Sequence, residues 1–531
     1  MKNIYKNIIV GFSFIALLSS CESELDLSNP TALSLEELLQ TEDGFIALSN
    51  GVLDAYQKVP ANEFLMTELR SDNVRANSEN GNFPAISAYN VDANNGDVAT
   101  YYSNNMHVIK HANTIIDNRF LASKNQQYTV GEAYFMRALA HFNLVRAYQN
   151  VPYIDKVLDV VNEEAYDYPQ LDEATVYSKI IADFNTSIAY LDGVEQNRYR
   201  PSKGAAIALS AKAYLSQPNP NYSEAELLLA SIIENSDSYN YDLIYTEREN
   251  AKQFEFNPDP DDNTVDLLTD AEYWANLAID YGNVFGNQIS DGYTDGVLDG
   301  SWSNNPGLEI NEEILFSIAY DLVSSDNYTT SDSGLDDQLE TDAESHSFAM
   351  TLQGPSNGIN IATLEFLEVM TPELQPVRFY ASIDALSYNP ADVTNDTFNV
   401  KFPTDGEIGD NDWIVLRYSD VLLLYAEAIL AGGDSTTDTR ALDAFNKVHL
   451  RAGFEESVLL TKAELLAERR VEFIYENQRL YDLIRFGEAD NVLRKFSTDN
   501  SLNYTSEKKY LPFPQREIDN LPNFYDQNDG Y

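Results

Sequence analysis

The sequence has one cysteine, Cys21, in 531 residues, and only 34 lysines and arginines against 85 aspartates and glutamates. A single cysteine excludes an intramolecular disulfide, so the fold must rest on a large core, which a chain of this length can supply. The formal net charge of −51 repels phosphate and makes nucleic acid a poor partner. No apolar run beyond the N-terminal segment approaches the roughly 20 residues of a membrane-spanning helix.

The N-terminal segment is typical of a secretory signal. Lys2 and Lys6 precede a short apolar stretch, residues 8–18, and small residues lead to Cys21. The motif "LSSC" matches a bacterial lipobox, which predicts removal of residues 1–20 and acylation of Cys21. The alternative is a chance cysteine beside an ordinary cleavage site. Because each buried CH₂ of an acyl chain contributes roughly 0.8 kcal/mol, two or three chains would hold the protein at a membrane.

Helical periodicity predicts four pairs of helices, several of them opened by capping boxes. The predicted pairs are residues 34–58 with 101–118, 129–149 with 173–192, 202–216 with 223–235, and 414–431 with 437–452. The predicted capping boxes are Ser34/Glu37, Thr129/Glu132, Ser223/Glu226 and Thr461/Glu464. Each pair has about the size of a tetratricopeptide (TPR) unit, although the spacing between pairs is irregular. The predicted fold class is therefore mainly α, a TPR-like helix-pair scaffold.

The composition changes in the middle of the chain. Residues 236–412 are rich in Asn, Asp, Gly, Ser and Tyr, which predicts a loop-rich insertion carrying short strands, one of them within residues 312–320. Residues 461–487 predict a long helical segment, and residues 508–523 a proline-punctuated tail lying back across the body. We therefore divide the chain after the signal into residues 21–235, 236–412 and 413–531, which together form one compact domain.

Sites for catalysis or metal binding have little support in the sequence. His107 and His111 are four residues apart, but without the Glu of a zinc-protease motif a packing or surface role on a helix is the better interpretation. The acidic loop that contains Asp259 and Asp266 lacks the spacing of an EF-hand, so structural calcium stays open and no other cofactor is predicted. With 85 acidic residues, paired carboxylates carry no information about a glycosidase. We predict no catalytic residue and no metal ligand.

Aromatic residues in loop-like stretches are the best candidates for ligand binding. The C–H face of a sugar ring stacks on an aromatic plane, while its hydroxyls need amide or carboxylate partners nearby. Two stretches, residues 82–97 and 290–305, offer both. The predicted binding residues are Phe83, Tyr89, Asn94, Asn95, Asp97, Trp274, Trp302, Tyr320 and Tyr328. Trp413 directly precedes a predicted helix and is assigned to packing.

Seven segments of the chain resemble the SusD/RagB family of Bacteroidetes outer-membrane lipoproteins, in the order of that family. They are "CESELDLSNP", "EAYFMRALAHFNLVRAYQNVPYI", "RPSKGAAIALSAKAYLSQ", "LRYSDVLLLYAEAIL", "ALDAFNKVHLRAGF", "LLAERRVEFIYENQRLYDLIRFG" and "YLPFPQREIDNLPN". The resemblance implies TPR-like helix pairs that support an irregular ligand-binding face. It transfers no binding residue, because the family's binding residues lie outside these segments.

The resemblance also implies a location and a partner. We expect a non-enzymatic, lipid-anchored protein on the surface of the outer membrane, where the acidic residues after Cys21 resemble a surface-export signal. It would bind oligosaccharide or polysaccharide and deliver it to a SusC-like TonB-dependent transporter. Peptide capture, as in the RagB branch, is the nearest alternative. A secreted glycoside hydrolase and a lid without a ligand of its own are the others.

Overall fold

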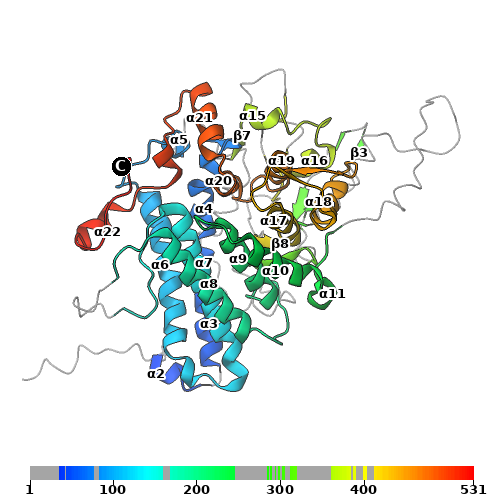
Figure 1. Ribbon diagram of the computed structural model, residues 1–531. Helices are drawn as coiled ribbons and strands as arrows, with labels where there is room; N and C mark the ends of the chain where they lie inside the picture. Colours follow the sequence, from blue (N-terminus) through cyan, green and yellow to red (C-terminus); the bar gives the residue numbers. More distant parts are fainter. Residues whose placement is uncertain are drawn as a thin grey trace, which may run out of the picture.

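The computed structural model describes most of the chain. The described residues are 35–41, 43–76, 83–158, 168–244, 311–319, 360–383, 387–389, 397, 399–402 and 412–531, together with residues 281, 284–285, 287–289, 293–294, 297–298 and 302–304. In Figure 1 long helices form a column on one side of the molecule, and shorter helices and strands cover the other side. Within the described residues no helix combines the length and apolarity needed to cross a membrane.

Eight helices make the scaffold. They are α3 (Gly44–Gln57), α6 (Gly96–Asp117), α7 (Gln127–Tyr148), α8 (Glu173–Tyr190), α9 (Lys203–Ser216), α10 (Tyr222–Ile233), α17 (Tyr418–Leu430) and α18 (Thr439–Arg451). Each helix packs against the next in this order, even where α10 is followed by α17. All four predicted pairs are present, and the prediction of a mainly α, TPR-like fold is confirmed.

Shorter elements complete the described fold. The helices are α2 (Leu35–Leu38), α4 (Pro60–Met66), α5 (Phe83–Ser87), α11 (Ser236–Tyr239), α15 (Leu364–Leu367), α16 (Pro376–Ser382), α19 (Lys462–Glu472), α20 (Arg479–Arg485), α21 (Ala489–Asp499) and α22 (Gln515–Asn520). Antiparallel two-stranded sheets pair β1 (Val74–Arg75) with β7 (Ile361–Ala362), β6 (Ile314–Ile318) with β8 (Trp413–Arg417), and β9 (Ser435–Thr436) with β10 (Leu460–Thr461). The buried strand predicted within residues 312–320 is β6. Trp413, 2% exposed in β8, packs in the core as predicted.

Helix α7 is buried along almost its whole length, and it carries polar side chains into the core. Arg137 donates two hydrogen bonds to Asp183 of α8, at 2.6 and 2.7 Å. His141 stays neutral, because burial lowers its pKa to about 3, and its Nε2 accepts a hydrogen bond from Ile154 N at 3.1 Å. These partners remove the cost that unpaired polar groups would carry inside the column.

The C-terminal helices differ from prediction in one respect. The Thr461/Glu464 capping box is confirmed, because Thr461 Oγ1 accepts from Glu464 N at 3.1 Å and Glu464 accepts from Thr461 N at 2.9 Å. The predicted long helical segment is interrupted between α19 and α20. Tyr475 and Asn477 have φ angles of 66° and 59° there, in the left-handed region that cannot continue a right-handed helix.

Two other predicted capping boxes are wrong. Helix α7 begins before Thr129, and Glu132 is buried, where it accepts hydrogen bonds from Ser49 and Arg200. Helix α10 is capped by Asn221, not by Ser223. At α7 the predicted Glu of the box is bound by tertiary partners, and at α10 the neighbouring Asn221 forms the cap instead of Ser223. Ser34 lies outside the described residues.

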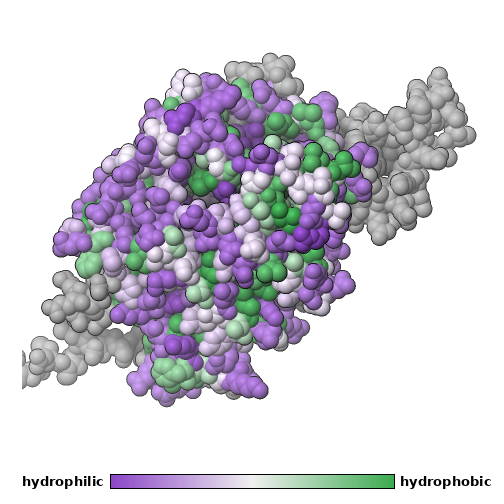
Figure 2. All heavy atoms as spheres, in the orientation of Figure 1, coloured by the Kyte–Doolittle hydropathy of each residue, from purple (hydrophilic) through white to green (hydrophobic). Residues whose placement is uncertain are grey.

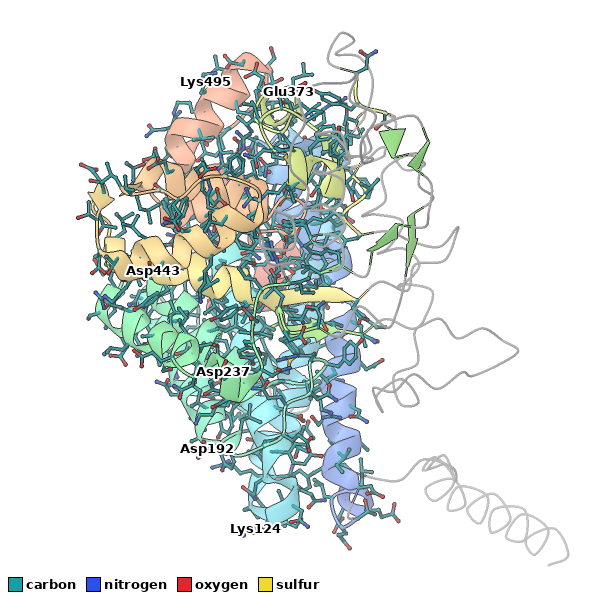
Figure 3. All side chains as sticks on the ribbon, turned by 90° about the vertical axis from the view of Figure 1, so that its right-hand side faces the viewer. Lys124, Asp192, Asp237, Glu373, Asp443 and Lys495 are labelled. Carbon is teal, nitrogen blue, oxygen red and sulfur yellow. The ribbon has the colours of Figure 1, made fainter. Side chains whose placement is uncertain are left out.

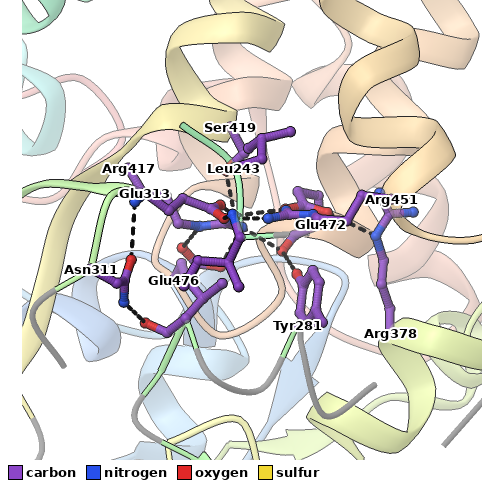
Figure 4. A network of polar contacts seen from close by, with 12 residues as sticks. Leu243, Tyr281, Asn311, Glu313, Arg378, Arg417, Ser419, Arg451, Glu472 and Glu476 are labelled. Carbon is purple, nitrogen blue, oxygen red and sulfur yellow. Dashed lines mark hydrogen bonds and ion pairs between the residues drawn. The ribbon is translucent and has the colours of Figure 1, made fainter. Parts of the chain in front are cut away.

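A buried cluster of ion pairs joins the C-terminal helices to the strands (Figure 4). Its centre is Glu472, whose Oε1 accepts from Arg417 at 2.6 Å and Arg451 at 2.5 Å, while its Oε2 accepts from Arg378 at 2.8 Å. Burial alone would raise the pKa of Glu472, but the three guanidinium groups hold it well below the ordinary value. Arg417 also bonds Glu313 beside β6, at 2.7 Å, so the cluster connects elements far apart in the sequence.

The C-terminal tail lies across the body, as predicted. Leu511 N donates to Ala147 O in α7 at 2.8 Å, and Gln515 N donates to Ala93 O at 2.9 Å. Phe513 is fully buried and packs edge-on against Tyr102. The tail therefore holds the end of α7 next to the segment that leads into α6.

Substitution of Glu472 by Gln is expected to lower the free energy of unfolding by about 3–5 kcal/mol, because it leaves buried guanidinium groups without a counter-charge. Urea unfolding followed by circular dichroism measures the loss. The matched control is Glu226→Gln, which removes an exposed ion pair with Arg440 and should change stability by about 0–1 kcal/mol. Equal effects of the two substitutions would contradict the role assigned to Glu472.

Candidate functional site

Five of the predicted binding residues lie close together on the segment from α5 to the start of α6. Phe83 opens α5 and is partly buried against the core. The segment is held by residues near the C-terminus, where Asn503 N donates to Ala88 O at 3.1 Å and Lys508 Nζ to Tyr89 O at 2.7 Å. The stretch read as a loop from sequence is therefore a short helix and a turn fixed by distant partners.

Tyr89 is a core residue and cannot offer its ring to a ligand. It is 3% exposed, its hydroxyl donates to Arg70 O at 2.7 Å, and its ring packs edge-on against Tyr504. Its backbone is left-handed, with φ 58°, which the tertiary partners impose. The prediction that Tyr89 stacks on a sugar is wrong, because composition cannot distinguish a ring turned inward by such contacts.

The three polar candidates of this segment differ in their environment. Asn95 caps α6, since its Oδ1 accepts from Asp97 N at 2.9 Å and from Val98 N at 3.1 Å. Its Oδ1 therefore has a structural role, and contact of Asn95 with a ligand stays a prediction. Asp97 lies in the first turn of α6, and partial burial raises the pKa of its carboxyl group. Asn94 is exposed and stays a candidate for binding hydroxyl groups.

Trp302 lies on a small ribbon of strands. Strand β2 (Asn287–Ile289) pairs antiparallel with β5 (Trp302–Asn304), and Trp302 lies opposite Ile289. Between them, β3 (Tyr293–Thr294) pairs with β4 (Val297–Leu298). Figure 3 shows these strands at the margin of the molecule, on the side away from α18. The other aromatic candidates, Trp274, Tyr320 and Tyr328, and the acidic loop considered for calcium lie outside the described residues.

A network of charged side chains lies next to α5, around residues 68–72. Asp72 accepts two hydrogen bonds from Arg479, at 2.8 and 3.0 Å, and pairs with Arg470 at 2.9 Å. Glu68 is buried nearby and accepts from Asn73 Nδ2 at 3.3 Å, while its Oε2 has no hydrogen-bond partner among the described residues. Burial raises the pKa of Glu68 to about 7, and this effect outweighs the lowering by its hydrogen bonds with Asn73 and the Tyr475 backbone and by the nearby Arg479.

An apolar pocket between α18, α19 and the segment that joins α15 to α16 was not predicted. It has a volume of about 280 Å³, and its walls include Phe445, His449, Phe454, Val369 and Val471. The rings of Phe445, His449 and Phe454 form a stacked row, with centroid distances of 5.0 and 4.7 Å. Figure 2 shows hydrophobic residues gathered over this side of the molecule.

The polar groups around the apolar pocket are already engaged. His449 Nδ1 lies 2.9 Å from Glu468 Oε2, and the other oxygen of Glu468 accepts from Arg378. Exposed aliphatic side chains, among them Leu374 and Val458, lie on the adjoining segments. The spacing of Phe445 and His449 on one helix face was the only local signal of this pocket. Val369 and Gln375, between α15 and α16, supply its opposite wall from another part of the chain.

The described surface offers aromatic, amide and carboxylate groups for binding, on a rigid helical support. Within the part of the chain that the structure describes, no group of three or more His, Cys, Asp or Glu could hold a metal ion. His107 and His111 lie on the exposed side of α6. The fold defines a class of helical proteins in which TPR-like pairs carry an irregular face.

Comparison with known proteins identifies the family. Residues 392–531 match the SusD family model, and residues 23–215 match a SusD-like model described as "starch-binding associating with outer membrane". The chain belongs to the SusD/RagB family. SusD-like protein P2 of Formosa agariphila is 24% identical over 554 residues, which cover 98% of this chain and 99% of the relative.

Solved structures share the fold. A laminarin-binding SusD-like protein is 21% identical, with a TM-score of 0.63 over 92% of this chain and 98% of its own. A SusD superfamily protein from Bacteroides vulgatus is 19% identical, with a TM-score of 0.68 over 93% of this chain and 99% of its own. These likenesses extend along nearly the whole chain, so the helical scaffold and the segments that it supports belong to one architecture.

Glu68 predicts a pH-dependent stability. Its ordinary pKa is 4.5 and its pKa in the folded protein is about 7, so between these values the folded state holds a proton that the unfolded chain releases. The wild-type protein should therefore lose stability as the pH rises through this window, by about 3 kcal/mol relative to Glu68→Gln. Urea unfolding of both proteins at pH 4.5, 6 and 8 measures the difference between their free energies of unfolding. A difference that does not change with pH would contradict the raised pKa of Glu68.

Proposed function

We propose that the protein is a non-catalytic glycan-binding lipoprotein on the surface of the outer membrane. It binds oligosaccharide or polysaccharide and delivers it to a SusC-like TonB-dependent transporter. The observation that carries the proposal is the match of residues 23–215 to a family described as starch-binding and associated with the outer membrane. The laminarin-binding relative of the same fold supports a glycan as the ligand.

The surface charge agrees with a neutral ligand. With a net charge of −51, the protein repels polyanions, whereas its electrostatic field neither attracts nor repels an uncharged polysaccharide. Binding would use aromatic stacking and hydrogen bonds to hydroxyl groups that are otherwise well solvated. The surplus free energy of such contacts is small, so we expect modest affinity for a single site.

The migration of the purified protein should be retarded in native gels that contain laminarin or starch. Trp302→Ala should weaken this binding by about tenfold or more, because an aromatic anchor is removed. The matched control is Phe120→Ala, which removes an aromatic ring that is 77% exposed on a different part of the surface. Circular dichroism establishes that both variants fold. Retention of full affinity by Trp302→Ala would remove Trp302 from the site.

The same preparations distinguish the other functional classes. A binding protein leaves the polysaccharide intact, so reducing ends should not accumulate during incubation. Sustained release of reducing ends by the wild-type protein would instead identify a glycoside hydrolase. Absence of binding to every polysaccharide tested, together with normal transporter assembly, would identify a lid without a ligand of its own.

Peptide binding of the RagB type is the second candidate function. The apolar pocket lined by Phe445 and Phe454 favours it, because its polar groups are engaged and its walls suit an apolar side chain. Its volume of about 280 Å³ is enough for one large side chain. Binding of casein-derived peptides in place of polysaccharide would make this the function of the protein.

Cys21 should be the lipid anchor. In cells grown with labelled palmitate, the wild-type protein should carry the label and fractionate with the outer membrane, and Cys21→Ala should lose both properties. Ser20→Ala is the control, since it keeps a small residue before the cysteine. A Cys21→Ala protein that still fractionates with the outer membrane would exclude anchoring through this residue.

A further inference from the structure

A polar pocket lies where the C-terminal tail crosses the end of α7. It has a volume of about 290 Å³ and is lined by the two residues that follow α7 and by residues of the tail, among them Gln149, Asn150, Lys509, Asn528 and Asp529. This volume is close to the lower limit of about 300 Å³ for small-molecule sites, enough for one sugar ring. The pocket lies in a different part of the fold from the apolar pocket and the ribbon that carries Trp302.

The backbone at the pocket is strained. Gln149 has φ 65° and ψ −78°, and Asn150 N donates to Tyr148 O at 2.9 Å, which together make the rare positive-φ form of a γ-turn. Glycine would adopt this conformation at lower cost, but the Gln149 side chain hydrogen-bonds the partly buried Glu173. Strain held in place by tertiary contacts is common where a binding group must be positioned.

The tail fixes the other wall of the pocket. Asn528 Nδ2 donates to Tyr148 O at 2.8 Å and to Leu511 O at 2.7 Å, which leaves its Oδ1 as an acceptor. Gln527 is bonded on both sides to the backbone of Phe513, at 2.7 and 2.8 Å. The hydrogen bonds of Asn528 and Gln527 therefore hold the tail in place at the end of α7, and the pocket is formed without a ligand.

Several polar groups in the pocket are available to a ligand. The side chains of Asn150 and Asp529 have no hydrogen-bond partner among the described residues, and Lys509 adds an ammonium group. An amide, a carboxylate and an ammonium together supply donors and acceptors for neighbouring hydroxyls. The carboxylates of Glu507 and Asp529 against one lysine give a small negative balance, which disfavours phosphate and other anions.

We propose that this tail pocket is a saccharide subsite, which binds one neutral sugar residue through hydrogen bonds to Asn150, Asp529 and Lys509. The proposal rests on the proposed glycan-binding function and adds a second point of contact. Two contacts on one polysaccharide chain raise the overall affinity without either being strong, since the second binding event is intramolecular.

The test measures the affinity of the full-length protein for laminarin and starch by affinity electrophoresis and calorimetry. Asn150→Ala should weaken binding of the polysaccharide that the wild type binds by about three- to tenfold, because hydrogen bonds to sugar hydroxyls are lost. Asn125→Ala is the matched control. Asn125 is an exposed asparagine at the opposite end of α7 and should leave affinity unchanged. If Asn150→Ala does not fold, Asp529→Asn, two residues from the C-terminus, replaces it.

The outcomes separate this inference from the proposed function. Wild-type binding that is equally strong in a folded Asn150→Ala protein overturns the subsite and leaves the proposed function standing. A wild-type protein that binds neither polysaccharide overturns the proposed function and the subsite with it. Weakened binding in Asn150→Ala, with an unchanged melting temperature and an unaffected Asn125→Ala, supports the subsite.

Discussion

The carboxylate of Glu472 is the interaction on which the C-terminal half of the molecule depends. Its oxygens accept from Arg378, Arg417 and Arg451, so one side chain of α19 ties together α16, β8 and α18. A buried charge of this kind is stable only when all its partners are present, since each missing partner leaves an ion without solvent or counter-charge. The cluster therefore links the packing of α16, β8 and α18, because loss of one element would leave charges of the others buried without a partner.

This cluster also shapes the surface. The chain has only 34 basic residues, yet Arg378, Arg417 and Arg469 are among its largest fully buried side chains. Each buried guanidinium neutralises a buried carboxylate, so the pair leaves the net charge of the surface unchanged but raises the ratio of acidic to basic residues that remain on it. The scarcity of cations that makes nucleic acid a poor partner is set by composition, and the buried pairs leave still fewer cations on the surface. It leaves hydrogen bonding and stacking as the means by which this surface can bind a ligand.

Much of the scaffold was predictable because its information is local. Helical periodicity located all four pairs, and the Thr461 capping box was found from four residues. The errors have a common physical cause in long-range contacts. Glu132 pairs with Arg200 and does not form the predicted cap, and the Tyr89 side chain is buried, with its hydroxyl donating to Arg70 O. The apolar pocket needs the segment of Val369 and Gln375 beside α18, a proximity that no local pattern contains, so the candidate sites were less predictable than the fold.

The tail explains why the two candidate binding surfaces that it contacts are assembled from distant parts of the sequence. On one side Gln515 holds the segment that carries Asn94, and on the other Asn528 clamps the turn at Gln149. Both surfaces therefore depend on the same stretch of chain being docked against α6 and α7. Phe513, buried between them, couples the two through the hydrophobic core. A ligand that contacts both surfaces would stabilise the docked tail, and docking of the tail would in turn organise both surfaces before the ligand arrives.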